Sequence, residues 1–137
     1  GTRPKPPSDL RSPVLRRHGE AAAQASFTRI YQTWPDLAYR YGEKGRQLTA
    51  EDNVWHLNFL DASFAVGDAS QFERYADWLL RFLSGRGLGA EHVAGAFGFL
   101  ADALETAEVG PNLHAHRQEL VDRLRQTAEK IQKSEPS

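Results

Sequence analysis

The chain has 137 residues, with 17 lysines and arginines against 18 aspartates and glutamates, and it contains neither cysteine nor methionine. A net charge near zero argues against a nucleic-acid binder, which needs a clustered cationic surface. The lack of cysteine excludes disulfides, thiolate metal sites, cysteine nucleophiles and thioether-linked cofactors. No apolar run reaches the roughly 18 residues of a membrane span, and residues 1–12 lack the apolar core of a signal peptide.

The length predicts a single domain, and the lack of a membrane span and of a signal peptide predicts a cytoplasmic protein. Because translation starts at methionine, we also expect the chain to have been trimmed, either from a tag or out of a longer protein. In the second case it would be one module of a larger assembly.

The N-terminal part of the chain predicts an arm followed by a helix. Residues 1–12 carry three prolines and little apolar content, which is typical of a flexible arm or linker. Ser12 followed by Pro13 is a common helix start, with serine as the cap and proline at the first helical position. This helix should run to Trp34, because Pro35 disfavours helical geometry in its predecessor.

The middle of the chain predicts a short helix, a loop and a long helix. The short helix should cover residues 36–41 and lead into a polar loop over 41–46, in which two glycines lie close together. Thr49, with the acidic Asp52 three positions later, resembles a capping box. It should therefore cap a helix over 51–66.

Three more helices are predicted in the C-terminal half. Asp68 or Ser70 should cap a helix that reaches Leu83, since apolar residues recur there at i, i+3 and i+4. A glycine-rich loop over 85–89 separates it from a helix expected over 90–107. A last amphipathic helix is expected over 112–132.

The pattern predicts an all-α fold, because no stretch alternates with a period of two. Five or six helices of unequal length should pack around the helix over 51–66, which is apolar on nearly all sides. A globin-like stack suits such helices better than a regular four-helix bundle. We expect this domain over residues 13–133, with a disordered tail over 134–137.

The spacing of several residues between 45 and 70 resembles the core of phycobiliproteins, the bilin-carrying globins of cyanobacterial antennae. The matching positions are Gly45-Arg46, Thr49, Asp52, Leu57 and the turn Gly67-Asp68-Ala69-Ser70. A leucine follows Asp52 by five residues and the turn follows it by fifteen, as in that family. The resemblance implies a phycocyanin-like helical stack that binds a linear tetrapyrrole.

Two departures from that family change the expected chemistry. Thr49 stands where the family has the bilin-attaching cysteine, and Glu51 replaces a neighbouring arginine. The long N-terminal helical pair of antenna subunits is also absent. The chain is more similar to photoglobins and bilin-biosynthesis-associated globins, through the stretch Tyr41-Gly-Glu-Lys-Gly-Arg46 and His56. Photoglobins commonly occur beside cobalamin-binding light-sensor domains, so such a domain or another signalling domain is an expected neighbour.

The resemblance implies a site for biliverdin or a related bilin, held without a covalent bond by a photosensory or pigment-carrying module. Asp52 would accept hydrogen bonds from several pyrrole N–H groups, because an ionised carboxylate is a pure acceptor with about four lone-pair sites. The cations Arg46, Lys44 and Arg40 would hold the propionates. Thr49, at the cysteine position, is a further candidate site residue. The rings expected to wall the pigment are Tyr41, Trp34, Trp55, His56, Phe59, His92 and the stripe Tyr75, Trp78 and Phe82.

The residues leave other interpretations open. Asp52 at the start of a helix is also what capping and the helix dipole favour, and the aromatic stripes are also what a core would show. His56 and His92 could be haem ligands, although neither lies in a recognisable haem-globin context. The domain could instead be a ligand-free interaction module that forms a homodimer. No catalytic motif is present, so we do not expect an enzyme, and no metal site is expected.

Overall fold

The computed structural model describes residues 12–134, and within them every regular element is a helix. The elements are α1 (Pro13–Thr33), α2 (Asp36–Ala65), α3 (Ala69–Ser84), α4 (Ala90–Thr106), the short 3₁₀ helix η1 (Pro111–Leu113) and α5 (His114–Ser134). The predicted all-α helical stack is confirmed, whereas its likeness to globins stays a prediction. The predicted arm over residues 1–12 lies outside the described residues except for Ser12. The predicted tail lies outside them except for Ser134, which ends α5.

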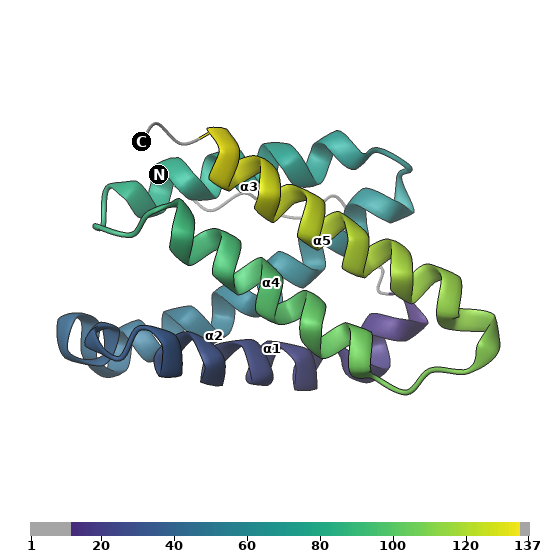
Figure 1. Cartoon of the computed structure of the whole chain (residues 1–137), viewed down its shortest axis with the longest axis horizontal. Helices are drawn as coiled ribbons and strands as arrows, with labels where there is room; N and C mark the ends of the chain where they lie inside the picture. Colours follow the sequence, from purple (N-terminus) through teal and green to yellow (C-terminus); the bar gives the residue numbers. More distant parts are fainter. Residues whose placement is uncertain (1–11, 135–137) are drawn as a thin grey trace.

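Helix α4 packs mainly against two neighbours, α5 and α1. Figure 1 shows α4 and α5 running antiparallel, with α1 along one side of the pair and α3 along the other. Phe97, Leu100, Ala101 and Leu104 on α4 are completely buried. The helix over 51–66 was expected to be central, but α4 makes the more extensive contacts. Its alanines and glycines allow this, because small side chains let α1 and α5 approach closely.

Several predicted helix ends are confirmed by their hydrogen bonds. The Ser12 hydroxyl accepts from the backbone N–H of Leu15 at 3.2 Å, and Pro13 occupies the first turn of α1. The Asp68 carboxylate caps α3 by accepting from the backbone N–H of Ser70 at 3.0 Å. Gly67 follows the end of α2 with a φ of 70°, which glycine adopts without strain.

The predicted loop over 41–46 and the predicted cap at Thr49 are wrong. The chain is helical from Asp36 to Ala65, and only Gly42 departs from helical geometry, with φ 62° and ψ −155°. Thr49 lies inside the helix, where its hydroxyl donates to the carbonyl of Gly45 at 2.8 Å. A Cβ at Gly45 would collide with the side chain of Tyr41. The second glycine is therefore required by a close approach across a kink, and not by a loop.

The surface carries an ion cluster that joins α1, α4 and α5. Asp102 accepts from Arg29 at 2.7 Å and from Arg125 at 2.9 Å, and Arg125 also donates to Glu105. Burial by itself raises the pKa of Asp102, but the two guanidinium groups outweigh it and hold that pKa below its usual value. Hydrogen bonds to Glu105 and then to Asp102 raise the pKa of Arg125. The cluster stays charged at neutral pH and connects three helices.

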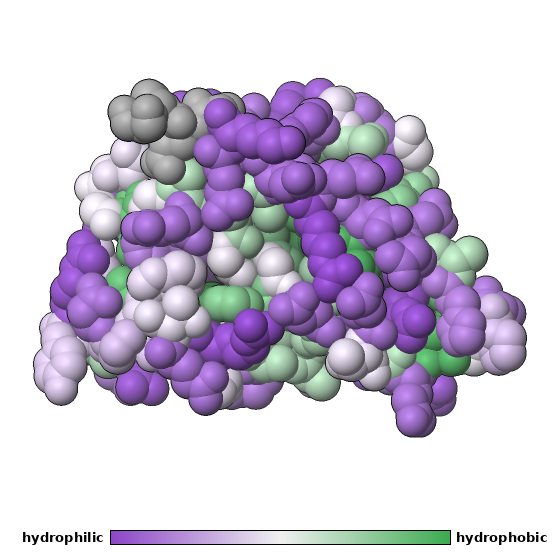
Figure 2. All heavy atoms as spheres, in the orientation of Figure 1, coloured by the Kyte–Doolittle hydropathy of each residue, from purple (hydrophilic) through white to green (hydrophobic). Residues whose placement is uncertain are grey.

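The exposed face drawn in Figure 2 is mainly hydrophilic, with apolar colour in patches between the purple side chains. Among the helices within residues 12–134, none is both long and apolar enough to cross a membrane.

Candidate functional site

A cavity of about 560 Å³, which we call the outer cavity, opens beside the kink in α2. Its wall comes from the end of α1, from both halves of α2, from the end of α3 and from the loop that follows α3. The lining residues are Tyr31, Leu37, Arg40, Tyr41, Lys44, Gly45, Leu48, Thr49, Asp52, Phe82, Leu83, Arg86 and Leu88.

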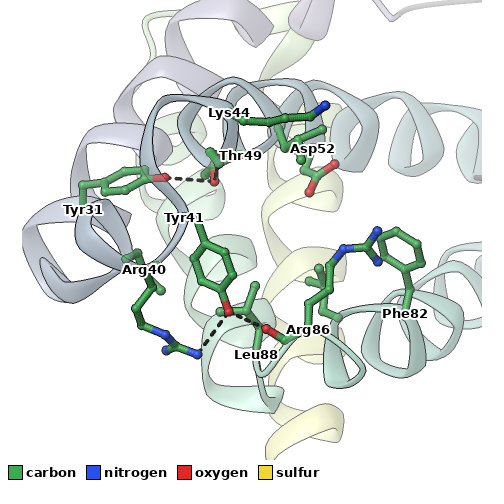
Figure 3. A pocket seen from close by; sticks show the side chains of 13 residues that line it. Tyr31, Arg40, Tyr41, Lys44, Thr49, Asp52, Phe82, Arg86 and Leu88 are labelled. Atoms are coloured by element: carbon green, nitrogen blue, oxygen red, sulfur yellow. Dashed lines mark hydrogen bonds between the residues drawn. The ribbon is translucent and has the colours of Figure 1, made fainter.

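The kink at Gly42 is what makes two walls from one helix. Its φ and ψ fall in a region that is essentially open only to glycine. The chain changes direction there, so Arg40 and Tyr41 lie on one side of the cavity and Lys44 and Asp52 lie on another (Figure 3). A straight helix would send these side chains along a single surface.

Asp52 lies at the inner end of the outer cavity. Figure 3 shows its carboxylate pointing into the hollow, from the wall opposite Phe82 and Arg86. The side chain is partly buried. It also borders a second hollow of about 70 Å³, which we call the inner cavity. Asp52 thus lies at the junction of the two spaces.

The inner cavity is smaller and has polar groups on an apolar wall. Thr49, Asn53, His56 and His92 border it, together with Asp52. Its volume is far below the roughly 300–1,000 Å³ of pockets that hold drug-sized ligands, so it is too small for a haem between the two histidines. It is large enough for water molecules, and polar walls are what such waters need.

Three cations line the outer cavity against the single carboxylate of Asp52. Arg40 and Lys44 come from the two halves of α2, and Arg86 comes from the loop after α3. The Arg86 guanidinium lies 4.0 Å from the centre of the Phe82 ring, which fixes it beside an aromatic wall. The excess of positive charge favours an anionic ligand.

Hydrogen bonds fix several of the polar side chains on the wall. The Tyr41 hydroxyl donates to the carbonyl of Arg86, and Arg40 donates to that hydroxyl at 3.0 Å (Figure 3). On the opposite side, the hydroxyls of Tyr31 and Thr49 are 3.3 Å apart and share a hydrogen bond. These bonds hold the wall in place before any ligand arrives.

The structure brings six of the predicted site residues together on the outer cavity: Arg40, Tyr41, Lys44, Thr49, Asp52 and Phe82. His56 and His92 border only the inner cavity. The Nδ1 atom of His56 is 2.7 Å from the hydroxyl of buried Tyr75, and Nδ1 of His92 accepts the backbone N–H of Gly89 at 3.0 Å.

The other predicted site residues do not line either cavity. Phe59 stacks on Tyr75 with ring centroids 4.2 Å apart and planes 10° apart, and Trp55 and Trp78 extend this ring cluster. These four were expected to wall a pigment, but they pack with one another because helical spacing turns them toward the α2–α3 contact.

Trp34 and Arg46 also take positions away from the cavity wall. Trp34 lies 4.8 Å from the His92 ring and covers Gly95, where a Cβ would collide with its indole. The Arg46 guanidinium lies 4.9 Å from the centre of the Tyr31 ring on the outside of the helix. Trp34 therefore packs behind His92, which borders the inner cavity, and Arg46 packs behind Tyr31, which lines the outer cavity.

Of the aromatic stripe expected on the helix that reaches Leu83, only Phe82 lines the outer cavity. The sequence interpretation missed the rest of that wall, which is Leu83, Arg86 and Leu88, and it also missed Tyr31, Leu37 and Leu48. One signal was available, since Arg86 is a cation between two glycines directly after a helix. The importance of Arg86 depends on the direction in which the kink at Gly42 turns the chain, which no local pattern revealed.

Among residues 12–134, no group of three histidine, aspartate or glutamate side chains is placed to hold a metal ion. Comparison of the chain with models of protein families, with curated proteins and with solved structures finds no match in any of the three. The volume, the charge and the hydrogen-bonding groups of the outer cavity determine what it can bind.

Proposed function

We propose that the outer cavity binds a linear tetrapyrrole of the biliverdin type without a covalent bond. The observation that carries this proposal is the placement of one carboxylate, Asp52, at the inner end of a 560 Å³ cavity whose rim bears Arg40, Lys44 and Arg86. A bilin has the matching chemistry, with N–H donors along its middle and two carboxylates on its edge.

The match has a physical basis in each part of the pigment. An ionised carboxylate accepts several hydrogen bonds at once, so Asp52 suits a row of pyrrole N–H groups. A protonated pigment would also place a positive charge beside the Asp52 carboxylate, which favours its ionised form. The propionates would meet the guanidinium groups of Arg40 and Arg86, which form two-pronged hydrogen bonds with carboxylates, and the ammonium group of Lys44.

The apolar and aromatic walls support a flat ligand. Tyr31, Tyr41 and Phe82 line the cavity together with leucines, and the cavity volume lies in the range of sites for drug-sized molecules. Rings against such walls lose rotational freedom, which would fix the geometry of a flexible tetrapyrrole.

Attachment would be non-covalent because the chain has no cysteine. Thr49 lies on the wall, and its hydroxyl bonds the carbonyl of Gly45 and the hydroxyl of Tyr31. In this proposal Thr49 shapes the wall, and the pigment leaves the protein on denaturation.

The resemblance to photoglobins and phycobiliproteins supplies the biological role within this proposal. A globin-like fold, a photosensory or pigment-carrying role in the cytoplasm, a homodimer and a neighbouring cobalamin-binding or signalling domain all remain predictions. Binding, and not bond chemistry, is the activity we propose.

An absorbance titration with biliverdin tests the proposal. The wild-type protein should shift and sharpen the red band of the pigment at a stoichiometry of one. Asp52→Asn should weaken binding by roughly ten- to a hundredfold, the factor for a lost hydrogen bond to a charged group. Asp77→Asn is the matched control, because Asp77 is exposed on α3 away from both cavities.

Three results would count against the proposal. An unchanged pigment spectrum with wild-type protein would overturn it, and equal effects of the two variants would remove Asp52 from the site. Protein that takes up neither biliverdin nor haem, yet elutes as a stable oligomer, would support the alternative of a ligand-free interaction module.

A further inference from the structure

We propose that residues 36–41, the first turns of α2, form a gate on the outer cavity. The gate turns about Gly42 and is held shut by Tyr41 and Arg40 on the loop between α3 and α4. This inference rests on the proposed function only for the identity of the ligand whose entry and release the gate would control.

The hinge is the backbone of Gly42. Its φ of 62° and ψ of −155° end one helical segment and begin the next within a single residue. A Cβ placed there would meet nothing within 4 Å, so glycine is required by its dihedral angles and not by lack of space. Open space around a residue with wide backbone freedom is what a hinge needs.

The latch consists of hydrogen bonds that cross from the gate to the loop after α3. The Tyr41 hydroxyl donates to the carbonyl of Arg86, and Arg40 donates to the carbonyl of Gly87 at 3.3 Å. Gly87 has a φ of 81°, and a Cβ there would lie 2.9 Å from a guanidinium nitrogen of Arg40. The absence of a side chain at Gly87 thus lets the arginine reach the loop.

Little else anchors the gate. Leu37 is its one buried side chain, whereas the Tyr39 side chain is 92% exposed and Asp36 is also exposed. Leu37 and Tyr41 belong to a small apolar cluster with Ile30 and Ala96, separate from the main core. Segments with few buried contacts and solvent-exposed hydrogen bonds open at a small fraction of the cost of global unfolding.

The gate forms a wall of the cavity, so its motion would set the rates of binding. Leu37, Arg40 and Tyr41 all line the outer cavity. If ligand passes only when the gate is open, weakening the latch raises the association and dissociation rate constants by the same factor. The dissociation constant then stays unchanged, because the latch is equally weakened in the free and bound states.

The decisive experiment measures amide hydrogen exchange in the ligand-free protein over residues 36–46. Tyr41→Phe keeps the ring and removes the latch hydroxyl, so exchange there should be about fivefold faster, the factor for one exposed hydrogen bond. Tyr39→Phe removes the same atom from a neighbouring exposed ring and should leave exchange as in wild type. In the wild-type protein, exchange over residues 36–46 should be faster than exchange in the core of α4, because opening the gate costs less than global unfolding.

A stopped-flow experiment with biliverdin then tests whether the gate controls the ligand. In Tyr41→Phe the association rate constant and the dissociation rate constant should both rise about fivefold. Equal exchange over 36–46 in all three proteins would overturn the gate, whatever the protein binds. Faster exchange in Tyr41→Phe without any biliverdin binding would keep the gate and overturn the proposed ligand. A rise in the dissociation rate constant alone would make Tyr41 a ligand contact and would overturn gating.

Discussion

Replacing Gly42 by alanine should destabilise the protein, whereas the same replacement at Gly98 should stabilise it. A Cβ at either glycine meets nothing within 4 Å, so steric clash plays no part in the comparison. Gly42 has a φ of 62° and a ψ of −155°, whereas Gly98 lies inside the regular helix α4. The pair therefore isolates the effect of backbone conformation.

The size of each effect follows from backbone energetics. A non-glycine residue forced into the conformation of Gly42 costs about 1–3 kcal/mol of stability. At Gly98 alanine should add about 0.5–1 kcal/mol, because it loses less backbone freedom on folding and is the better helix former. For a domain of this length, these values correspond to a melting temperature lower by roughly 3–10 °C for Gly42→Ala and higher by a few degrees for Gly98→Ala.

Thermal unfolding followed by far-ultraviolet circular dichroism measures both shifts, and urea midpoints give an independent value. Opposite signs for the two variants would support the kink as described. A Gly42→Ala protein as stable as wild type would contradict the kink, because α2 would then pass through residue 42 with ordinary helical angles. The outer cavity would lose one of its walls in that case.

Three further outcomes are expected. Arg86→Gln should weaken biliverdin binding by up to about fivefold in low salt and by less in high salt. Arg81→Gln, on the exposed face of α3, is the control and should leave binding unchanged. Equal dissociation constants for the two variants in an absorbance titration would contradict a role for Arg86. Tyr75→Phe removes the hydroxyl that lies 2.7 Å from Nδ1 of buried His56. It should lower the free energy of unfolding by about 1–3 kcal/mol, measured by urea denaturation. An unchanged urea midpoint would mean that this hydrogen bond does not stabilise the protein. Because the pKa of Asp102 is depressed in the folded state, its contribution to stability is present above about pH 4 and is lost as the pH falls through the lowered pKa. Asp102→Asn should therefore lower the melting temperature at pH 7 and narrow the difference between pH 7 and pH 3, and parallel curves for variant and wild type would contradict this.

Local signals in the sequence predicted the helix ends correctly where the cause is local. Ser12 and Asp68 cap helices through side-chain oxygens that reach backbone N–H groups within the same turn. Gly67 ends α2 through its own dihedral angles. Such features depend on neighbours two or three residues away, so the sequence contains all that is needed to predict them.

The kink of α2 was misread because two glycines close together resemble a loop. Gly42 breaks the helix through its backbone angles, but Gly45 lies in the helix and is required by the nearby Tyr41 side chain. A close approach of this kind depends on where the kink points, which is not a property of the local pattern. The same error placed a cap at Thr49 and made Asp52 look like a residue of the first turn.

In the candidate site, too, the residues close together in the sequence were predicted, and those brought in by packing were not. Arg40, Tyr41, Lys44 and Asp52 lie close together in the sequence, and the motif resemblance singled them out. The opposite wall comes from around Arg86, some forty residues later, and depends on packing between the start of α2 and the loop after α3. The residue pattern within the start of α2 or within the loop after α3 does not predict a contact between the two.

The decisive measurement is a crystal structure of the protein grown with biliverdin. We expect one pigment in the outer cavity, with pyrrole nitrogens within about 2.7–3.2 Å of the Asp52 carboxylate and a propionate on Arg40, Lys44 or Arg86. An outer cavity without pigment in crystals saturated with biliverdin, or a pigment bound at another face, would contradict it.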